Sequence, residues 1–248
     1  MKSLLRYPGG KTRAIKILEK YIPENTKRIC SPFFGGGSFE LYLSSKGIEV
    51  HGYDIFKPLV YFWQTLKCDR WFIYNYVLQY LSITKSQFYK FQETILEYGS
   101  YPKEMGAIFY ILNRCSFSGS TLSGGISPNT PRFNQASIDR VKEFKMPIDV
   151  NYGSFEHIIP MYKDWLIFAD PPYYISQSLY GNKGDTHTNF NHHLLADILI
   201  KHGNFVLTYN DCPEIRELYK GCKFDIVEWA YGMNTSKKSN EAIITPKD

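Results

Sequence analysis

The stretch SPFFGGGSFELYL, residues 31–43, decides the expected fold of this chain. It follows a short apolar run at 28–31 and opens an apolar helical pattern, so it has the form of a strand-to-helix turn. Glycines at positions 35, 36 and 37 let the backbone turn tightly and let a ligand approach where any Cβ atom would clash. Such a turn is also a common tight connection in α/β folds, so its meaning depends on the residues around it.

An acidic residue strengthens the ligand-binding interpretation. Asp54 ends the next apolar run, VHGYDI, 19 residues after Gly35, which is about the spacing at which an acid reaches the two hydroxyls of an adenosine ribose. Asp is also favoured as a helix N-cap, and both roles can coexist. The loop and the acid together predict a cofactor that contains adenosine, and the spacing alone leaves NAD and S-adenosylmethionine open.

Short apolar runs recur along the chain and alternate in part with helical patterns. Helical spacing is found at 14–21 and at 193–201. Strands that alternate with helices predict an α/β fold with a mostly parallel sheet covered on both faces. The expected strands are 28–31, 49–53, 148–152, 165–169, 204–209, 224–229 and 242–245.

One long segment interrupts this alternation and predicts an insertion. Residues 55–147 hold a capping box at 84–87 and a second amphipathic helix at 105–115, followed by a polar stretch rich in Ser, Gly and Asn. We therefore expect a catalytic domain made of residues 1–54 and 148–248, with a docked helical insertion that carries a hairpin or loop.

Composition narrows the class of protein. The 248 residues carry a formal net charge of +5, which leans weakly toward a polyanionic partner. Five cysteines without a CxxC pair argue against a disulfide framework and a four-thiolate metal site. No stretch approaches the roughly 18 apolar residues of a membrane span. We expect a soluble, cytoplasmic protein with no membrane partner.

The second informative stretch is FADPPYYISQ, residues 168–177. Asp170 follows an expected parallel strand, where chemistry collects in such sheets. Pro171 and Pro172 make the turn rigid and remove two N–H donors, so the carbonyls of Asp170 and Pro171 are left as acceptors. Two acceptors without a donor suit a substrate NH2 group, and Tyr173 offers a ring on which a planar base can stack. We expect the Asp170 carboxylate to face the glycine loop free of any salt bridge.

This arrangement answers a definite chemical problem. The lone pair of an exocyclic purine amine is delocalised into the ring, which makes the amine a poor nucleophile. Preorganised acceptors for both amine hydrogens help to localise that pair and lower the barrier by several kcal/mol. Attack on a sulfonium methyl group is then an in-line displacement that needs no covalent enzyme intermediate.

At this point the sequence resembles the Dam-type (D12 class, alpha-group) N6-adenine-specific DNA methyltransferases. The order of the motifs is the specific part, and the resemblance spans nearly the whole chain. The matching stretches are RYPGGK (6–11), PFFGGGSFE (32–40), GYDI (52–55), ILNRCSFSG (111–119), GSFE (153–156), DPPYY (170–174), THTNF (186–190), LTYND (207–211) and NTSKKSNEAIIT (234–245).

The resemblance implies a Rossmann-like methyltransferase sheet, S-adenosylmethionine as the cofactor, no metal, and double-stranded DNA as the partner. It implies cofactor contacts by Tyr7, Gly9 and Lys11 at the methionine portion, by Phe34, Gly35 and Gly37 in the loop, by Asp54 at the ribose, by Phe155 at the adenine, and by Asp170. Asp170, Pro171, Pro172 and Tyr173 then hold the target base, and Asn210 shapes the site. Plainer alternatives are a solvated Lys11, a core ring at Phe155 and a turn role for Asn210.

A target adenine reaches such a pocket only if it flips out of the duplex. Residues 176–190 are polar and glycine-rich, and we expect them to form a flap over the flipped base. The hairpin stretch SGSTLSGG lacks the Arg with which Dam enzymes read GATC, so that recognition sequence is not expected here. The side chains expected to contact DNA are Asn113, Arg114, Ser118, Ser120, Thr121, Asn129, Arg132, Lys237 and Lys238.

Several alternatives remain open. A nicotinamide dehydrogenase leaves D-P-P-Y unexplained, and a silent DNA-binding module does not need the glycine loop or its acid. Methylation of cytosine N4, an RNA base or a protein glutamine amide uses related chemistry, although N-P-P-Y is commoner for the last two. A cytosine C5 enzyme needs a Pro-Cys nucleophile, which is absent here. The histidines at 187, 192, 193 and 202 lack the spacing of zinc ligands.

Overall fold

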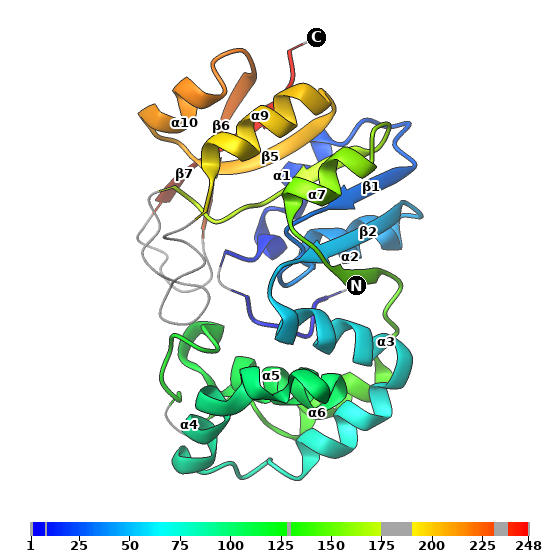
Figure 1. The fold of residues 1–248 in the computed structure, drawn as a ribbon, viewed down its shortest axis with the longest axis vertical. Coiled ribbons are helices and arrows are strands. Elements are labelled where there is room, and N and C mark those ends of the chain that lie inside the picture. The colour runs from blue at the N-terminus through cyan, green and yellow to red at the C-terminus, as the bar shows by residue number, and fades with distance from the viewer. Residues whose placement is uncertain (1, 8, 128–129, 175–189, 231–237, 248) are drawn as a thin grey trace.

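The computed structural model describes residues 2–7, 9–127, 130–174, 190–230 and 238–247, and within them seven strands form one sheet (Figure 1). The order is β3-β2-β1-β4-β5-β7-β6, in which β1 to β5 are parallel and β7 runs antiparallel to β5 and β6. Each predicted strand overlaps an observed one, and the predicted mostly parallel sheet is confirmed. The strands are β1 (Arg28–Ser31), β2 (Glu49–Asp54), β3 (Asp149–Tyr152), β4 (Leu166–Ala169), β5 (Phe205–Asn210), β6 (Lys223–Ala230) and β7 (Lys238–Thr245).

Helices cover both faces of the sheet because alternate residues of each strand point to opposite sides. On β4, Leu166 and Phe168 join one buried cluster with α1 and α2, whereas Ile167 and Ala169 join another with α7, α9 and α10. Figure 1 shows α7 and α9 on the near side of the sheet. These elements are η1 (Lys11–Arg13), α1 (Ile15–Leu18), η2 (Glu19–Tyr21), α2 (Ser38–Ser45), α7 (Phe155–Ile158), η5 (Ile159–Met161), α9 (His192–His202) and α10 (Pro213–Leu218).

The strand order places the candidate site. From β1 the chain first builds outward through β2 to β3 and then returns to the other side of β1 with β4. The carboxyl ends of β1, β2 and β4 therefore meet at a topological switch point, where open α/β sheets bind ligands. The antiparallel β7 between β5 and β6 differs from the 3-2-1-4-5-6 order of dinucleotide-binding dehydrogenases, which weakens the NAD alternative.

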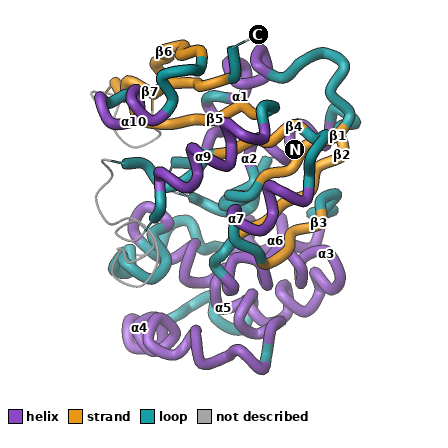
Figure 2. Tube along the Cα trace, turned by 45° about the horizontal axis from the view of Figure 1, so that its top comes forward, coloured by secondary structure: helices purple, strands orange, loops and turns teal. Residues whose placement is uncertain are grey.

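The segment between β2 and β3 is helical and packs on the sheet domain through a common core. Phe62 and Trp63 of α3 and Phe109 of α5 share a buried cluster with Phe34 of the glycine loop. Figures 1 and 2 show these helices gathered at the end of the molecule away from β6. The elements are α3 (Lys57–Leu78), α4 (Lys85–Thr94), η3 (Ile95–Ser100), α5 (Pro102–Cys115), η4 (Phe117–Gly119) and α6 (Gln135–Glu143).

The capping box predicted for α4 is confirmed. The Gln87 amide N–H donates to Thr84 Oγ1 at 3.2 Å, and the Thr84 N–H donates to Gln87 Oε1 at 2.9 Å. Helix α3 was not predicted as an element; it is kinked at Asp69, whose φ of −152° and ψ of 64° are not helical. No helix in the described ranges is long and apolar enough to cross a lipid bilayer.

Candidate active site

The glycine loop after β1 is held by the protein's own groups. Gly35 and Gly37 have φ values of 48° and 62°, in the left-handed region that favours glycine. A Cβ atom at Gly35 would lie 2.9 Å from the ring of Tyr7, and one at Gly37 would lie 2.6 Å from the ring of Phe34. The glycines are therefore required by the backbone conformation and by the packing of these two rings, in addition to any approach of a ligand.

Phe34 does not line a cofactor site, and this prediction is corrected. Its ring is buried and lies edge-on to Trp63 at 5.6 Å. The preceding Phe33 is partly buried and faces Phe155 at 5.6 Å and Phe190 at 5.7 Å. Counting the F-x-G-x-G motif from Phe33 also places its glycines at 35 and 37, so the sequence alone is compatible with Phe33 as the motif phenylalanine.

Phe33, Phe155 and Phe190 form an aromatic cluster beside the glycine loop. Phe155 and Phe190 are 5.3 Å apart, and Phe190 lies at 4.9 Å from His192 at the start of α9. Phe155 is largely buried in the core on the α9 side of the sheet. Phe155 is therefore a core ring, as in the plainer alternative, and it also borders the candidate site; its contact with a cofactor adenine stays a prediction.

Asp54 anchors the glycine loop from the end of β2. Its Oδ2 accepts a hydrogen bond from the Gly35 N–H and its Oδ1 accepts one from the Phe56 N–H, each at 2.9 Å. Burial raises the pKa of this carboxyl to about 6. The alternative of a helix N-cap does not hold, because the N-cap of α3 is Phe56. Both oxygens retain acceptor capacity for a further donor.

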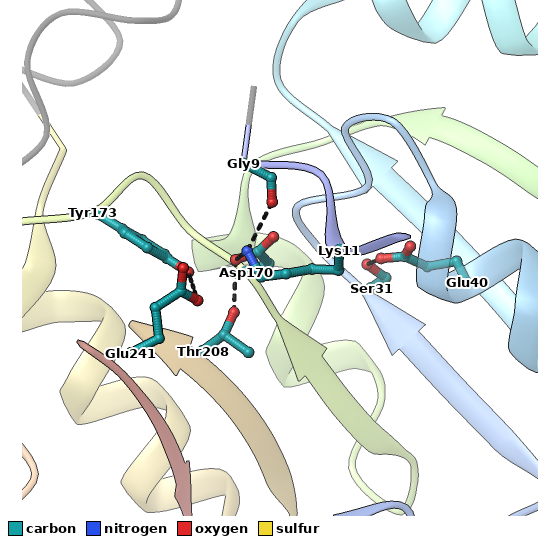
Figure 3. Close-up of polar contacts among 8 residues, drawn as sticks. All are labelled: Gly9, Lys11, Ser31, Glu40, Asp170, Tyr173, Thr208 and Glu241. Carbon is teal, nitrogen blue, oxygen red and sulfur yellow. Dashed lines mark hydrogen bonds and ion pairs between the residues drawn. The ribbon is translucent and has the colours of Figure 1, made fainter. Parts of the chain in front are cut away.

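Asp170, just beyond β4, forms a salt bridge with Lys11 (Figure 3). Lys11 Nζ lies 2.7 Å from Asp170 Oδ1 and donates to the carbonyl of Gly9 at 3.0 Å, while the Thr208 hydroxyl donates to Asp170 Oδ1 at 2.6 Å. The predictions of a donor-free site and of an unpaired Asp170 are therefore wrong. The physical reason is that Lys11 is only 4% exposed, and a buried ammonium needs a carboxylate partner.

The salt bridge leaves part of Asp170 available. Its side chain is 21% exposed, and among the described residues Oδ2 has no hydrogen-bond partner. Lys11 is an organised group rather than an ordinary solvated lysine. One carboxylate oxygen is thus fixed by two donors, and the other can accept a hydrogen bond from a ligand.

A second buried acid, Glu40 of α2, lies behind Lys11 (Figure 3). The Ser31 hydroxyl donates to Glu40 Oε1 at 2.8 Å. Burial, with a smaller contribution from the charge of Asp170, raises the pKa of Glu40 to about 7 against the opposing effects of the Ser31 hydrogen bond and the charge of Lys11. Sequence reasoning did not select Glu40 as a buried acid beside the site, although a glutamate within the largely apolar helix SFELYL is a visible signal.

Glu40 gives a testable pH dependence. Between its ordinary pKa of 4.5 and the folded value of about 7, the unfolded chain has lost the proton that the folded protein keeps, so rising pH lowers the free energy of unfolding. Glu40→Gln removes this titration. Between pH 5 and pH 8 the free energy of unfolding of the wild type should fall by roughly 2–3 kcal/mol more than that of Glu40→Gln. Urea unfolding at both pH values measures the difference, and parallel pH curves would contradict it.

The turn after Asp170 is fixed at two points. The Tyr173 hydroxyl donates to Glu241 Oε2 at 2.6 Å, and the Tyr174 N–H donates to Asn210 Oδ1 at 3.0 Å. Lys11 Nζ lies over the Tyr173 ring, 5.1 Å from its centroid. Asn210 thus shapes the turn through its side chain, and Glu241 is a further residue that sequence reasoning missed.

Two of the side chains expected to contact DNA are not placed to do so. Asn113 is 0% exposed; its amide donates to the carbonyls of Arg6 and Gly119 and accepts from the Arg6 N–H. Thr121 is also buried, and its hydroxyl donates to the Gly119 carbonyl at 3.1 Å. Both predictions are corrected, because these groups hold the N-terminal segment and the loop after α5 together.

The loop after α5 presents other groups at the surface. Phe117 is 64% exposed, and Ser118 next to it has a φ of 61°, which is unusual for a residue with a side chain. The Arg114 guanidinium donates to the Arg132 carbonyl through Nε at 2.9 Å and Nη2 at 2.5 Å. Sequence reasoning did not select Phe117, although it is the one large apolar side chain in SFSGS.

Arginines gather near this loop. Burial lowers the pKa of Arg6, and the charges of Arg132 and Arg114 lower it further. Like charges held this close favour an anionic partner. Ser120 is partly buried and donates to the Phe117 carbonyl at 2.8 Å.

The remaining predictions fall mainly outside the described residues. Asn129, Lys237 and positions 176–189 of the expected flap are in that group, and for Lys238 only the backbone, in β7, is described. Within the described ranges, no group of three or more His, Cys, Asp or Glu side chains is arranged to hold a metal ion.

Comparison with known proteins identifies the family of the chain. Residues 7–235 match the model of the D12 class N6 adenine-specific DNA methyltransferases. The chain is also 24% identical to the DNA N-6-adenine-methyltransferase of Escherichia phage P1 over 253 aligned residues, which cover 91% of this chain and 32% of that protein. The chain thus spans about a third of the length of this curated relative. With its motifs in order along the whole sheet domain, the chain belongs to the D12 class of N6 adenine-specific DNA methyltransferases.

Proposed function

We propose that this protein transfers a methyl group from S-adenosylmethionine to the N6 amine of an adenine flipped out of duplex DNA. The observation that carries the proposal is that three motifs meet at the carboxyl ends of neighbouring parallel strands. The glycine loop follows β1, Asp54 ends β2, and Asp-Pro-Pro-Tyr follows β4. Membership of the D12 class supports the same reaction.

The residues at this edge fit an adenosine-containing methyl donor. The rings of Phe33, Phe155 and Phe190 suit a planar purine, and Asp54 offers acceptors for ribose hydroxyls beside a loop that it holds in place. Gly9 and Lys11 lie on the Asp170 side, where we place the methionine portion. When bound, S-adenosylmethionine supplies an electrophilic methyl group.

Asp170 orients the target amine. Oδ2 accepts one amine hydrogen, while Lys11 and Thr208 prevent the carboxylate from turning away by holding Oδ1. We propose that Asp170 acts as a hydrogen-bond acceptor that orients the amine. We propose that a backbone carbonyl of the Pro171–Pro172 turn accepts the second amine hydrogen and that Tyr173 stacks on the base, a contact worth ~1–3 kcal/mol.

We propose that residues 55–147 hold the DNA. Arg114 and Arg132, with Arg6 nearby, are suited to phosphates, and Ser118 and Ser120 lie in the same loop. Phe117 is an exposed aromatic ring in a polar loop, as expected for a wedge that occupies the gap left by a flipped base.

Phe117→Ala tests the wedge. Loss of the ring should raise the KM for DNA roughly tenfold, equivalent to about 1.4 kcal/mol, without changing the affinity for S-adenosylmethionine. Steady-state kinetics with varied DNA measures the effect. Tyr101→Ala is the matched control, because Tyr101 is equally exposed in the same insertion but lies at the start of α5. Equal effects of the two changes would contradict the role of Phe117.

The reaction itself is tested with purified protein, S-adenosylmethionine carrying a labelled methyl group, and mixed-sequence duplex DNA. Mass spectrometry of the digested nucleosides should find the label only in the deoxyadenosine that is methylated at N6. Label in deoxycytidine methylated at N4, or in no nucleoside, would overturn the proposed substrate. Single-molecule sequencing of the product then identifies the recognition sequence.

A further inference from the structure

A buried carboxylate stands behind the ring expected to contact the target base. Glu241, on β7 opposite Asn210 of β5, is 1% exposed. Its Oε2 accepts the Tyr173 hydroxyl hydrogen at 2.6 Å, as Figure 3 shows. This is the length of a strong hydrogen bond between a hydroxyl and an ionised acceptor.

The sheet itself does not call for an acid at this position. The following β7 residues Ala242, Ile243 and Ile244 are fully buried and apolar, and burial of a carboxylate among such residues is costly unless hydrogen bonds compensate it. The compensation here includes the hydroxyl of Tyr173, a residue of the candidate site.

The Tyr173 ring is consequently held at both ends. Pro171 and Pro172 restrict its backbone, and Glu241 holds its hydroxyl. Lys11 Nζ lies over the Tyr173 ring, 5.1 Å from its centroid. The centroid of the Tyr209 ring lies 5.8 Å from that of the Tyr173 ring. Burial and the nearby acids keep the hydroxyl protonated, since they raise the pKa of Tyr173 well above its ordinary value.

We propose that Glu241 is a positioning residue, which fixes the plane of the Tyr173 ring by accepting its hydroxyl hydrogen bond. Stacking on a base depends on that plane, so Glu241 acts on methyl transfer through Tyr173 without touching the substrate. The effect of Glu241 on methyl transfer rests on the proposed function, whereas its effect on the Tyr173 ring does not.

The first test needs no ligand. In protein labelled with 13C at the tyrosine ring carbons, the signal that disappears in Tyr173→Phe identifies the ring. Ring flipping should be at least ~10-fold faster in Glu241→Ala than in the wild type, as expected when a buried charged hydrogen bond is lost. In Glu241→Gln, whose amide oxygen still accepts, it should stay within roughly threefold of the wild type. Ile244→Ala is the control for a loosened β7 and should leave the flipping unchanged. Equal flipping in the wild type and Glu241→Ala would overturn the proposal.

The second test uses kinetics on the recognition sequence of the wild type. Glu241→Ala should lower kcat ~10-fold with no change in the KM for S-adenosylmethionine, and Glu241→Gln should largely restore it. In a Tyr173→Phe background, Glu241→Ala should change kcat by less than about twofold, because the two residues act through one bond. Additive losses would overturn the positioning role. Wild-type protein that orders the ring but methylates no DNA would instead contradict the proposed function alone.

Discussion

Asp170→Ala should reduce methylation of DNA by at least ~10²–10³-fold, the range observed when a preorganised group at a reacting centre is removed. The alanine removes the acceptor Oδ2 and also leaves the buried Lys11 ammonium without its carboxylate. The dissociation constant for S-adenosylmethionine, measured by titration calorimetry, should change by no more than about threefold, because the expected cofactor contacts of Asp54 and Phe155 remain.

The control for this prediction is Asp164→Ala. Asp164 is exposed and precedes β4, whereas Asp170 follows it, so the same substitution is made at opposite ends of one strand. The control should retain full activity. If Asp170→Ala kept substantial activity, the assignment of Asp170 to the target amine would be wrong.

Asp54→Ala should act first on the cofactor. Removal of the carboxylate deletes the expected ribose acceptor and leaves the N–H groups of Gly35 and Phe56 without their partner. We expect the dissociation constant for S-adenosylmethionine to rise ~30–100-fold, equivalent to roughly 2–3 kcal/mol. Saturating cofactor should recover much of the activity, in contrast to Asp170→Ala.

The pKa of Asp54 adds a second readout. Because burial raises this pKa to about 6, the ionised acceptor is lost as the pH falls through 6, and cofactor affinity should fall with it. This part of the pH dependence should be absent in Asp54→Asn. Asp149→Ala, at the exposed start of the neighbouring β3, is the control. An unchanged dissociation constant in Asp54→Ala would contradict the ribose role.

The sheet was predictable because its strands are short apolar runs that end at turn residues. The run before Asp54 and the run before Asp170 both end within a residue of the observed strand. The parallel order then brings strand ends together whatever the intervening sequence contains. Helix α3 was not predictable in the same way, since large aromatic residues such as Tyr61, Phe62 and Trp63 follow one another and blur the helical period.

Side-chain partners across the fold were the part that sequence reasoning could not give. Lys11 meets Asp170, and Tyr173 meets Glu241, through contacts between segments far apart in the chain. Asn113 has the chemistry of a base-reading amide, but burial turns it into a link between backbone segments. Residue type predicted what each group can do, whereas only packing decided what it faces.

The indole of Trp63 donates to the carbonyl of Gly35 at 3.1 Å, which joins the first insertion helix directly to the glycine loop. A module tied down in this way cannot swivel about a linker to search for a new target. Relatives that recognise other DNA sequences are then expected to differ in the exposed loops farthest from this junction. The residue at the position of Trp63 and the glycine loop should either both be retained or change together. Exchange of a whole insertion between relatives should consequently damage cofactor binding unless the matching loop is moved with it.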